Sequence, residues 1–148
     1  MTETPDFAEQ YRRFNQLPPG AIAAMRRVGE PDELRETPGL YRLFAGVRPS
    51  DQQVRTAFVQ PWCQKASGEK SLAALCAEKI SEARIIQIAR AGFPGDLIAF
   101  RRLVIQLQPA LGWLEVARPV WYWGPTTKRR LVEDYYIALH KLEKGANP

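Results

Sequence analysis

Arginine is the residue type in this chain whose abundance and spacing point to chemistry. Fifteen of the 21 basic residues are arginines and six are lysines. A guanidinium can bond two oxygens of a phosphate at once, whereas a lysine ammonium acts as a point charge. Between Ser81 and Val132 the sequence has eight basic and three acidic residues, so this segment alone accounts for the net charge of +5. Such a local excess predicts an anionic partner.

The spacing of these arginines places them on the outer faces of two successive predicted helices. In residues 81–91, Arg84 and Arg90 recur at helical intervals opposite an isoleucine-rich face. In the next helix, Arg102 points away from the apolar stripe and Arg101 flanks it. We expect these side chains to contact phosphates, which would position a strand without reading its sequence. The competing interpretation is that nearby acids neutralise them: Glu78, Glu82 and Asp96.

The groupings of residues on which enzymes depend are missing from the sequence. His140 is the only histidine, and Cys63 and Cys76 form no CxxC motif, so no metal-ligand spacing occurs. There is also no glycine-rich phosphate loop and no nucleophile motif. We therefore expect no catalytic residue, no metal site and no cofactor. Both cysteines are expected to be reduced thiols of a cytoplasmic protein.

The elements that position the arginines are predicted to be helices. Apolar residues recur at helical spacing almost everywhere, and no alternating pattern extends beyond a few residues. The sequence thus predicts an all-α fold, a compact helical bundle with short connections. We expect Ser50 and Gln53 to form a capping box, and glycines to end two helices, at Gly92 and Gly145. The other expected N-caps are Asp6, Thr37, Ser71, Ser81 and Asp96.

A short polar stretch, residues 65–70, is the best candidate for a linker. The length of the chain suits a single all-helical domain over residues 1–148. The linker could divide that domain into two small lobes, residues 1–66 and 71–145. No apolar run approaches the roughly 20 residues of a membrane span. Because the first six residues are polar and acidic, we expect no secretory signal either.

Two further patterns have both a nucleic-acid interpretation and a simpler one. The aromatic residues from Trp113 to Trp123 could stack on bases, but their helical spacing favours core packing, with only Tyr122 partly exposed. Residues 81–108 could form a helix–turn–helix, although the turn over 92–95 is longer than usual. The second helix also offers few side chains for base edges. A DNA-binding regulator is therefore a lesser alternative.

Several blocks of sequence occur in a fixed order across nearly the whole chain. The first is MRRVGEPDELR at 25–35, followed by Pro38 and LYRL at 40–43. The others are EARIIQIARA at 82–91, RRL at 101–103, WYWG at 121–124 and LVED at 131–134. These blocks resemble the CasB family, the small subunits of the type I-E CRISPR surveillance complex, Cascade. The turn after Ala91 departs from the pattern, because Phe93-Pro94 stands where more basic character is expected.

The resemblance implies a non-catalytic, all-helical subunit present in two copies within the guide-RNA complex. It implies guide RNA, target DNA and other Cascade subunits as partners, and a role in holding the displaced DNA strand. By this resemblance the residues expected to face nucleic acid are Arg27, Arg84, Arg90, Arg101, Arg102, Lys128 and Arg129. For Arg26 and Arg27 a structural role, pairing with Glu30 or Asp32, stays open. The main alternative is a purely structural subunit whose arginines contact protein neighbours.

Overall fold

The structure is a computed structural model and describes residues 5–146. Within this range it contains helices and no strand, which confirms the predicted all-α fold. The helices, in chain order, are α1 (Phe7–Asn15), α2 (Pro19–Arg27), the 3-10 helix η1 (Pro31–Glu36), α3 (Pro38–Leu43), α4 (Asp51–Val59), the 3-10 helix η2 (Gln60–Trp62), α5 (Leu72–Lys79), α6 (Glu82–Arg90), α7 (Gly95–Gln106), α8 (Trp113–Trp121) and α9 (Pro125–Ala146).

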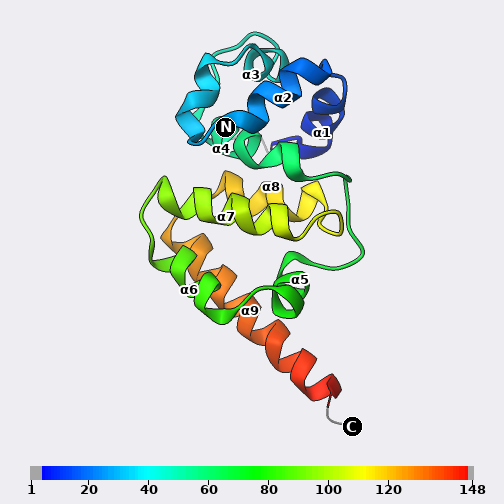
Figure 1. Ribbon diagram of the computed structural model, residues 1–148, viewed down its shortest axis with the longest axis vertical. Helices are drawn as coiled ribbons and strands as arrows, with labels where there is room; N and C mark the ends of the chain where they lie inside the picture. The colour runs from blue at the N-terminus through cyan, green and yellow to red at the C-terminus, as the bar shows by residue number, and fades with distance from the viewer. Residues whose placement is uncertain (1–4, 147–148) are drawn as a thin grey trace.

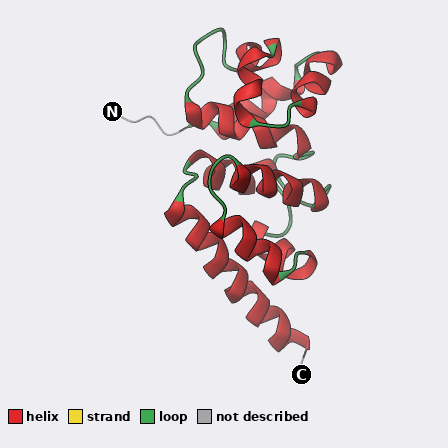
Figure 2. Ribbon diagram, turned by 60° about the vertical axis from the view of Figure 1, so that its left-hand side comes forward, coloured by secondary structure: helices red, strands yellow, loops and turns green. Residues whose placement is uncertain are grey.

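The helices pack in layers around a continuous apolar core (Figures 1 and 2). Helix α4 contacts α7 and α8, while α9 packs against α5 and α6 on the other side of the molecule. Fully buried side chains from both ends of the chain meet in this core, among them Leu34, Phe58, Phe100 and Trp113. Burying each such side chain stabilises the fold by roughly 1.5–3 kcal/mol before cavity terms. The core therefore joins the N-terminal helices to those that carry most of the basic residues.

Side-chain caps start four of the helices, as the sequence predicts. Asp6 accepts a hydrogen bond from the Glu9 amide at 2.9 Å. Ser50 and Gln53 form the expected capping box at 2.9 and 3.1 Å. The same type of cap is made by Ser71 and Ser81. Each cap satisfies amide groups that a helix start leaves without a partner.

The predicted boundary at Thr37 is confirmed, since α3 begins at Pro38 directly after it, although the Thr37 hydroxyl donates backwards to Leu34 and not to the helix. Two other predicted helix boundaries are wrong. Asp96 does not cap α7, which begins at Gly95, because the Asp96 side chain is buried and binds Lys128 instead. Helix α9 continues through Gly145 rather than ending there.

The polar stretch 65–70 is non-helical but is bonded along its length to the start of α8. The amides of Trp113 and Leu114 donate to the carbonyls of Lys65 and Ala66 at 2.8 and 2.9 Å. The Gly68 amide lies 3.3 Å from the Glu115 carboxylate. A Cβ at Gly68 would fall 2.6 Å from the Ala110 carbonyl oxygen. The segment is thus a fixed connection rather than a free linker.

The residues considered for catalysis are the two cysteines and the single histidine. Cys63 and Cys76 are free and buried, as predicted, and burial raises the pKa of each thiol to about 12. His140 is exposed on α9. Residues 5–146 contain no group of three or more His, Cys, Asp or Glu side chains that could hold a metal ion. No helix in the same range combines the length and apolarity needed to cross a membrane.

Candidate nucleic-acid interface

Four of the predicted nucleic-acid residues are exposed: Arg27, Arg90, Arg102 and Arg129. They come from the ends of α2 and α6, the middle of α7 and the first turns of α9. Within the described range, none of the four forms an ion pair with an acidic residue. Their guanidinium groups therefore keep all their donors available for an external anion. We refer to these residues as the four exposed arginines.

Arg101 makes internal contacts instead. Its guanidinium lies 4.0 Å from the centre of the Phe58 ring and donates to the carbonyl oxygen of Val28 at 2.7 Å. Burial lowers the pKa of this guanidinium, and the charge of Arg102 lowers it further. Cation–π contacts of this kind stabilise a fold by about 0.5–2 kcal/mol, depending on how far water is excluded. The side chain thus fastens α7 to the end of α2.

Lys128 is also held internally. Its ammonium donates to the Asp96 carboxylate at 2.9 Å and to the Ala91 carbonyl at 2.8 Å. The two residues are 9% and 2% exposed, so the ion pair is largely removed from water. The contact fastens the start of α9 to the turn between α6 and α7. Figure 1 shows that turn and the start of α9 on the same side of the molecule.

These two internal cations bring together the backbone segments that carry the four exposed arginines. Because Arg101 donates to the carbonyl of Val28, the chain at Arg102 comes near the chain at Arg27, although the two are far apart in sequence. Because Lys128 donates to the carbonyl of Ala91, the chain at Arg129 comes near the chain at Arg90. The fold thus joins segments of four helices, each of which carries one exposed arginine.

Arg84 is intermediate between the exposed arginines and the internally bound Arg101. It is half-buried, and its guanidinium contacts the side-chain oxygen of Gln106. Gln106 in turn donates to the Lys79 carbonyl at 3.2 Å. The contact joins the start of α6 to the end of α7 and leaves part of the guanidinium open to solvent. Arg84 thus keeps donors for an anion but is held more firmly than Arg90 or Arg102.

The acids that could have neutralised the arginines are engaged elsewhere. Glu78 pairs with Lys70 at 2.5 Å, and Glu82 accepts a hydrogen bond from Tyr136 at 2.6 Å. Asp96 pairs with Lys128. None of these three acids forms an ion pair with an arginine of α6 or α7 within residues 5–146, so direct contacts do not support the competing interpretation.

Arg26 is structural, but with partners other than the expected Glu30 or Asp32. Its guanidinium donates to the Pro61 carbonyl at 2.9 and 3.3 Å and lies 5.2 Å from the centre of the Trp62 ring. Trp113 is buried, as predicted, and its indole donates to the Phe7 carbonyl at 2.9 Å. Tyr122 is exposed, as predicted, but Trp121 and Trp123 are half-buried rather than fully packed in the core.

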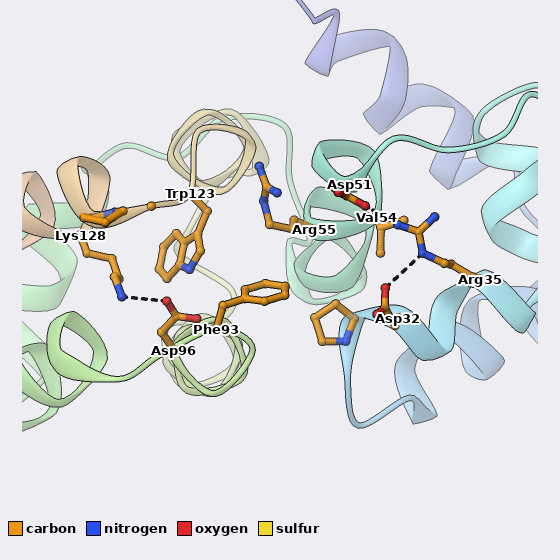
Figure 3. Close-up of a pocket in the computed structure, with 12 residues that line it drawn as sticks. Asp32, Arg35, Asp51, Val54, Arg55, Phe93, Asp96, Trp123 and Lys128 are labelled. Atoms are coloured by element: carbon orange, nitrogen blue, oxygen red, sulfur yellow. Dashed lines mark hydrogen bonds and ion pairs between the residues drawn. The ribbon is translucent and has the colours of Figure 1, made fainter.

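A pocket of about 520 Å³ lies beside the Lys128–Asp96 pair (Figure 3). It is formed where the α6–α7 turn and the α8–α9 turn face η1 and α4. Phe93, which is 58% exposed, and the half-buried Trp123 provide its aromatic surface. Sequence reasoning missed this site. The only signal was the unexpected apolar residue at the turn after Ala91.

Comparison with known proteins shows the family to which the chain belongs. No protein-family profile matches the chain. The CRISPR system Cascade subunit CasB of Escherichia coli (strain K12) is 34% identical over 160 aligned positions, which cover 95% of this chain and 99% of the relative. A chain in the crystal structure of E. coli Cascade bound to a PAM-containing dsDNA target superposes with a TM-score of 0.81 and 32% identity, covering 94% of this chain and 99% of that one. The chain belongs to the CasB family.

Proposed function

We propose that this protein is a non-catalytic subunit of a CRISPR surveillance complex and holds a nucleic-acid backbone through its four exposed arginines. The observation that carries the proposal is that these four guanidiniums are exposed and form no ion pair with any residue of 5–146. The family supports it, because the similar chain was solved in Cascade bound to a dsDNA target. The proposed partners are guide RNA, the displaced DNA strand, other Cascade subunits and a second copy of this chain.

The proposed role is to hold the displaced strand while guide RNA pairs with its complement. Exchanging a DNA duplex for an RNA–DNA duplex is nearly balanced in free energy, so modest contacts to a backbone can tip it. Each arginine that neutralises a phosphate releases counterions, which makes the contact favourable and independent of base sequence. Guanidiniums fixed on helices suit this task better than mobile loops, because less side-chain and backbone entropy is lost on binding.

In this proposal Arg101 and Lys128 act by positioning rather than by touching phosphate. Both were predicted to face nucleic acid, and in the structure each is turned inward: Arg101 donates to Val28 and stacks on Phe58, and Lys128 donates to Ala91 and Asp96. Arg84 contributes a weaker phosphate contact, because Gln106 holds part of its guanidinium.

The structure supports the two alternative functions, a purely structural subunit and a helix–turn–helix regulator, to different degrees. A purely structural subunit is favoured by apolar side chains on the outer half of α9, where Ile137 and Leu142 are 55% and 44% exposed. Such a surface suits a protein neighbour and is compatible with strand binding elsewhere. A helix–turn–helix regulator is disfavoured, because a recognition helix reads bases with its first residues. At the start of α7, Asp96 and Leu97 are buried.

The test is binding of fluorescently labelled single-stranded DNA, measured by anisotropy across a salt series. The variant is the triple substitution Arg90/Arg102/Arg129→Ala. If each arginine neutralises one phosphate, the log–log salt slope should shrink by roughly 0.7 per lost contact, about 2 in all. Affinity at low salt should fall with it.

The matched control removes the same charge from other exposed positions, as Arg42/Arg48/Lys144→Ala. This control should keep a salt slope close to that of the unchanged protein. Equal binding by the two triple variants would overturn the proposal, because net charge alone would then explain the affinity. Absence of binding by the unchanged protein at every salt concentration would also overturn it and favour the purely structural role.

A further inference from the structure

The pocket beside the Lys128–Asp96 pair has no part in the backbone contacts described above. Its most unusual feature is Phe93, a large apolar side chain that stands 58% exposed in the turn between α6 and α7. Trp123 lies next to it, and Pro31 and Pro125 complete the apolar part of the wall. A flat aromatic surface at the mouth of a pocket is the usual means by which proteins stack an unpaired base.

The charges that line the pocket cancel. Three cations and three carboxylates face it: Arg35, Arg55, Lys128, Asp32, Asp51 and Asp96. All three carboxylates are paired, since Arg35 bonds two of them at 3.1 and 2.6 Å and Lys128 holds the third at 2.9 Å. Arg55 directs two donors to the last carbonyls of α8, at 3.2 and 2.6 Å. The pocket thus suits an uncharged polar group and offers no strong site for phosphate.

One donor in the wall lacks an acceptor. The Nε1 of Trp123 is buried and forms no hydrogen bond with any described residue. Buried indole N–H groups usually have an acceptor, because leaving one without a partner costs about 1–3 kcal/mol. In Figure 3 the indole nitrogen lies on the side of the ring that faces Phe93. A base carbonyl or ring nitrogen that entered beside Phe93 would accept from this donor once a small turn of the aromatic rings uncovers it.

The pocket lies close in the chain to two of the proposed backbone contacts. Phe93 follows Arg90 by three residues, so their Cα atoms lie within roughly 11 Å of each other. Lys128, which lines the pocket, directly precedes Arg129. A base of a strand held by Arg90 and Arg129 would therefore have only a short distance to reach the pocket.

We propose that the pocket between Phe93 and Trp123 takes up an unpaired nucleobase of the strand held by Arg90 and Arg129. The inference rests on the proposed strand-holding function and adds to it a contact that recognises the base rather than the backbone. It also accounts for an apolar residue in a turn where basic character was expected. Because stacking tolerates every base, the contact should distinguish strands with bases from bare backbone without selecting a sequence.

The test compares two probes, an oligodeoxythymidylate and an oligonucleotide of the same length made of abasic sites. The full-length protein should bind the thymidylate more tightly than the abasic strand at the same salt concentration. Phe93→Ala should weaken thymidylate binding about tenfold and abolish the preference over the abasic strand. Its salt slope should stay unchanged, because no phosphate contact is lost. Phe93→Tyr should behave like the unchanged protein.

The matched control is Tyr122→Ala, since Tyr122 is an aromatic residue of similar exposure, 56%, that does not line this pocket. It should leave the preference for bases intact. Equal affinity of the unchanged protein for both probes would overturn the base pocket while leaving the strand-holding function in place. Loss of the preference in Tyr122→Ala but not in Phe93→Ala would also overturn it. Absence of binding to either probe would overturn both proposals together.

Discussion

Lys128 and Asp96 form an ion pair that is almost entirely removed from water, with 2.9 Å between the ammonium nitrogen and the carboxylate oxygen. The sequence places the two residues 32 positions apart, and the fold joins them across the interface of α7 and α9. Breaking such a pair by removing one partner usually costs 3–5 kcal/mol, because the other charge is left buried. Substitutions in this pair can therefore show whether Lys128 contacts phosphate directly or only positions the neighbouring arginines.

We expect Asp96→Asn to weaken binding of single-stranded DNA, even though it removes a negative charge. If Lys128 contacted phosphate directly, loss of its acidic neighbour would strengthen binding to an anion. If it positions Arg90 and Arg129, loss of the pair disturbs both arginines. Anisotropy titrations give the sign of the change, and circular dichroism shows whether the variant is folded. Tighter binding by a folded Asp96→Asn protein would refute the positioning role.

The double substitution Asp96→Leu with Lys128→Met tests the same point without leaving a buried charge. Apolar replacements of a buried ion pair are often neutral or stabilising. We expect this variant to unfold at a urea concentration near that of the unchanged protein and to keep the same salt slope for DNA binding. A slope smaller by about 0.7 would instead identify Lys128 as a phosphate contact.

Adjacent Arg101 and Arg102 should respond in opposite ways to substitution by methionine. Arg101→Met loses the contact with Phe58 and the hydrogen bond to Val28, so we expect the free energy of unfolding to fall by about 2 kcal/mol. Arg102→Met changes only an exposed side chain, and we expect a change within about 0.5 kcal/mol. Its salt slope for DNA binding should shrink by about 0.7. Urea unfolding and anisotropy titrations of both variants test this contrast. The reverse pattern, with Arg102→Met less stable and Arg101→Met weaker in its salt slope, would show that the two roles are assigned to the wrong residues.

The two buried thiols should make the protein less stable at high pH. Burial raises the pKa of Cys63 and Cys76 to about 12, above the unfolded value of about 8.5. Their contribution to stability is therefore complete below pH 8.5 and is lost as the pH rises towards 12, because the unfolded chain gives up these protons first. By pH 10 the loss is about 1–2 kcal/mol for each thiol. Urea unfolding at pH 8 and pH 10 measures the decline.

The control for the thiols is the double variant Cys63→Ala with Cys76→Ala. It retains every other group that titrates in this range, including Tyr135, whose pKa is also raised by burial. Its stability should decline less between pH 8 and pH 10 than that of the unchanged protein. Parallel declines in the two proteins would show that the thiols ionise alike in the folded and unfolded states.

Gly68→Ala should destabilise the protein, whereas Gly20→Ala should not. A Cβ at Gly68 would overlap the backbone oxygen of Ala110, at 2.6 Å, and backbone cannot move aside as a flexible side chain can. A Cβ at Gly20 in α2 would meet nothing within 4 Å, and alanine in a helix gains roughly 0.5–1 kcal/mol over glycine. Thermal unfolding of the two variants tests the contrast. Equal melting temperatures would mean that the connection at 65–68 is not held as the structure has it.

The helices and most of their caps could be predicted from the sequence because they depend on local information. The apolar spacing and the serines at 50, 71 and 81 act within a few residues of themselves. Asp96 shows where local information fails. An aspartate after Pro94 and Gly95 is a typical cap, but Lys128 competes for the same carboxylate from another helix. That competition exists only in the folded chain.

The candidate site could be predicted only in part, for a similar reason. Arginine abundance and helical spacing indicated that Arg90 and Arg102 point outwards, and both are exposed. The same spacing could not show that Arg101 donates a hydrogen bond to the carbonyl of Val28, which lies 73 residues earlier in the chain. Nothing in the sequence indicated that Phe93 and Trp123 line one pocket, because they lie in two turns far apart in the chain and no periodic pattern links such positions.

The bonds from Lys65 and Ala66 to the start of α8 have a consequence for how the protein can adjust to a partner. A connection tied to its neighbour at successive carbonyls provides no hinge, and buried side chains from before and after it share one core. The helices on the two sides of residues 65–70 therefore move as one body. A partner that meets α2 and α9 at the same time must accept the spacing that the fold sets between them.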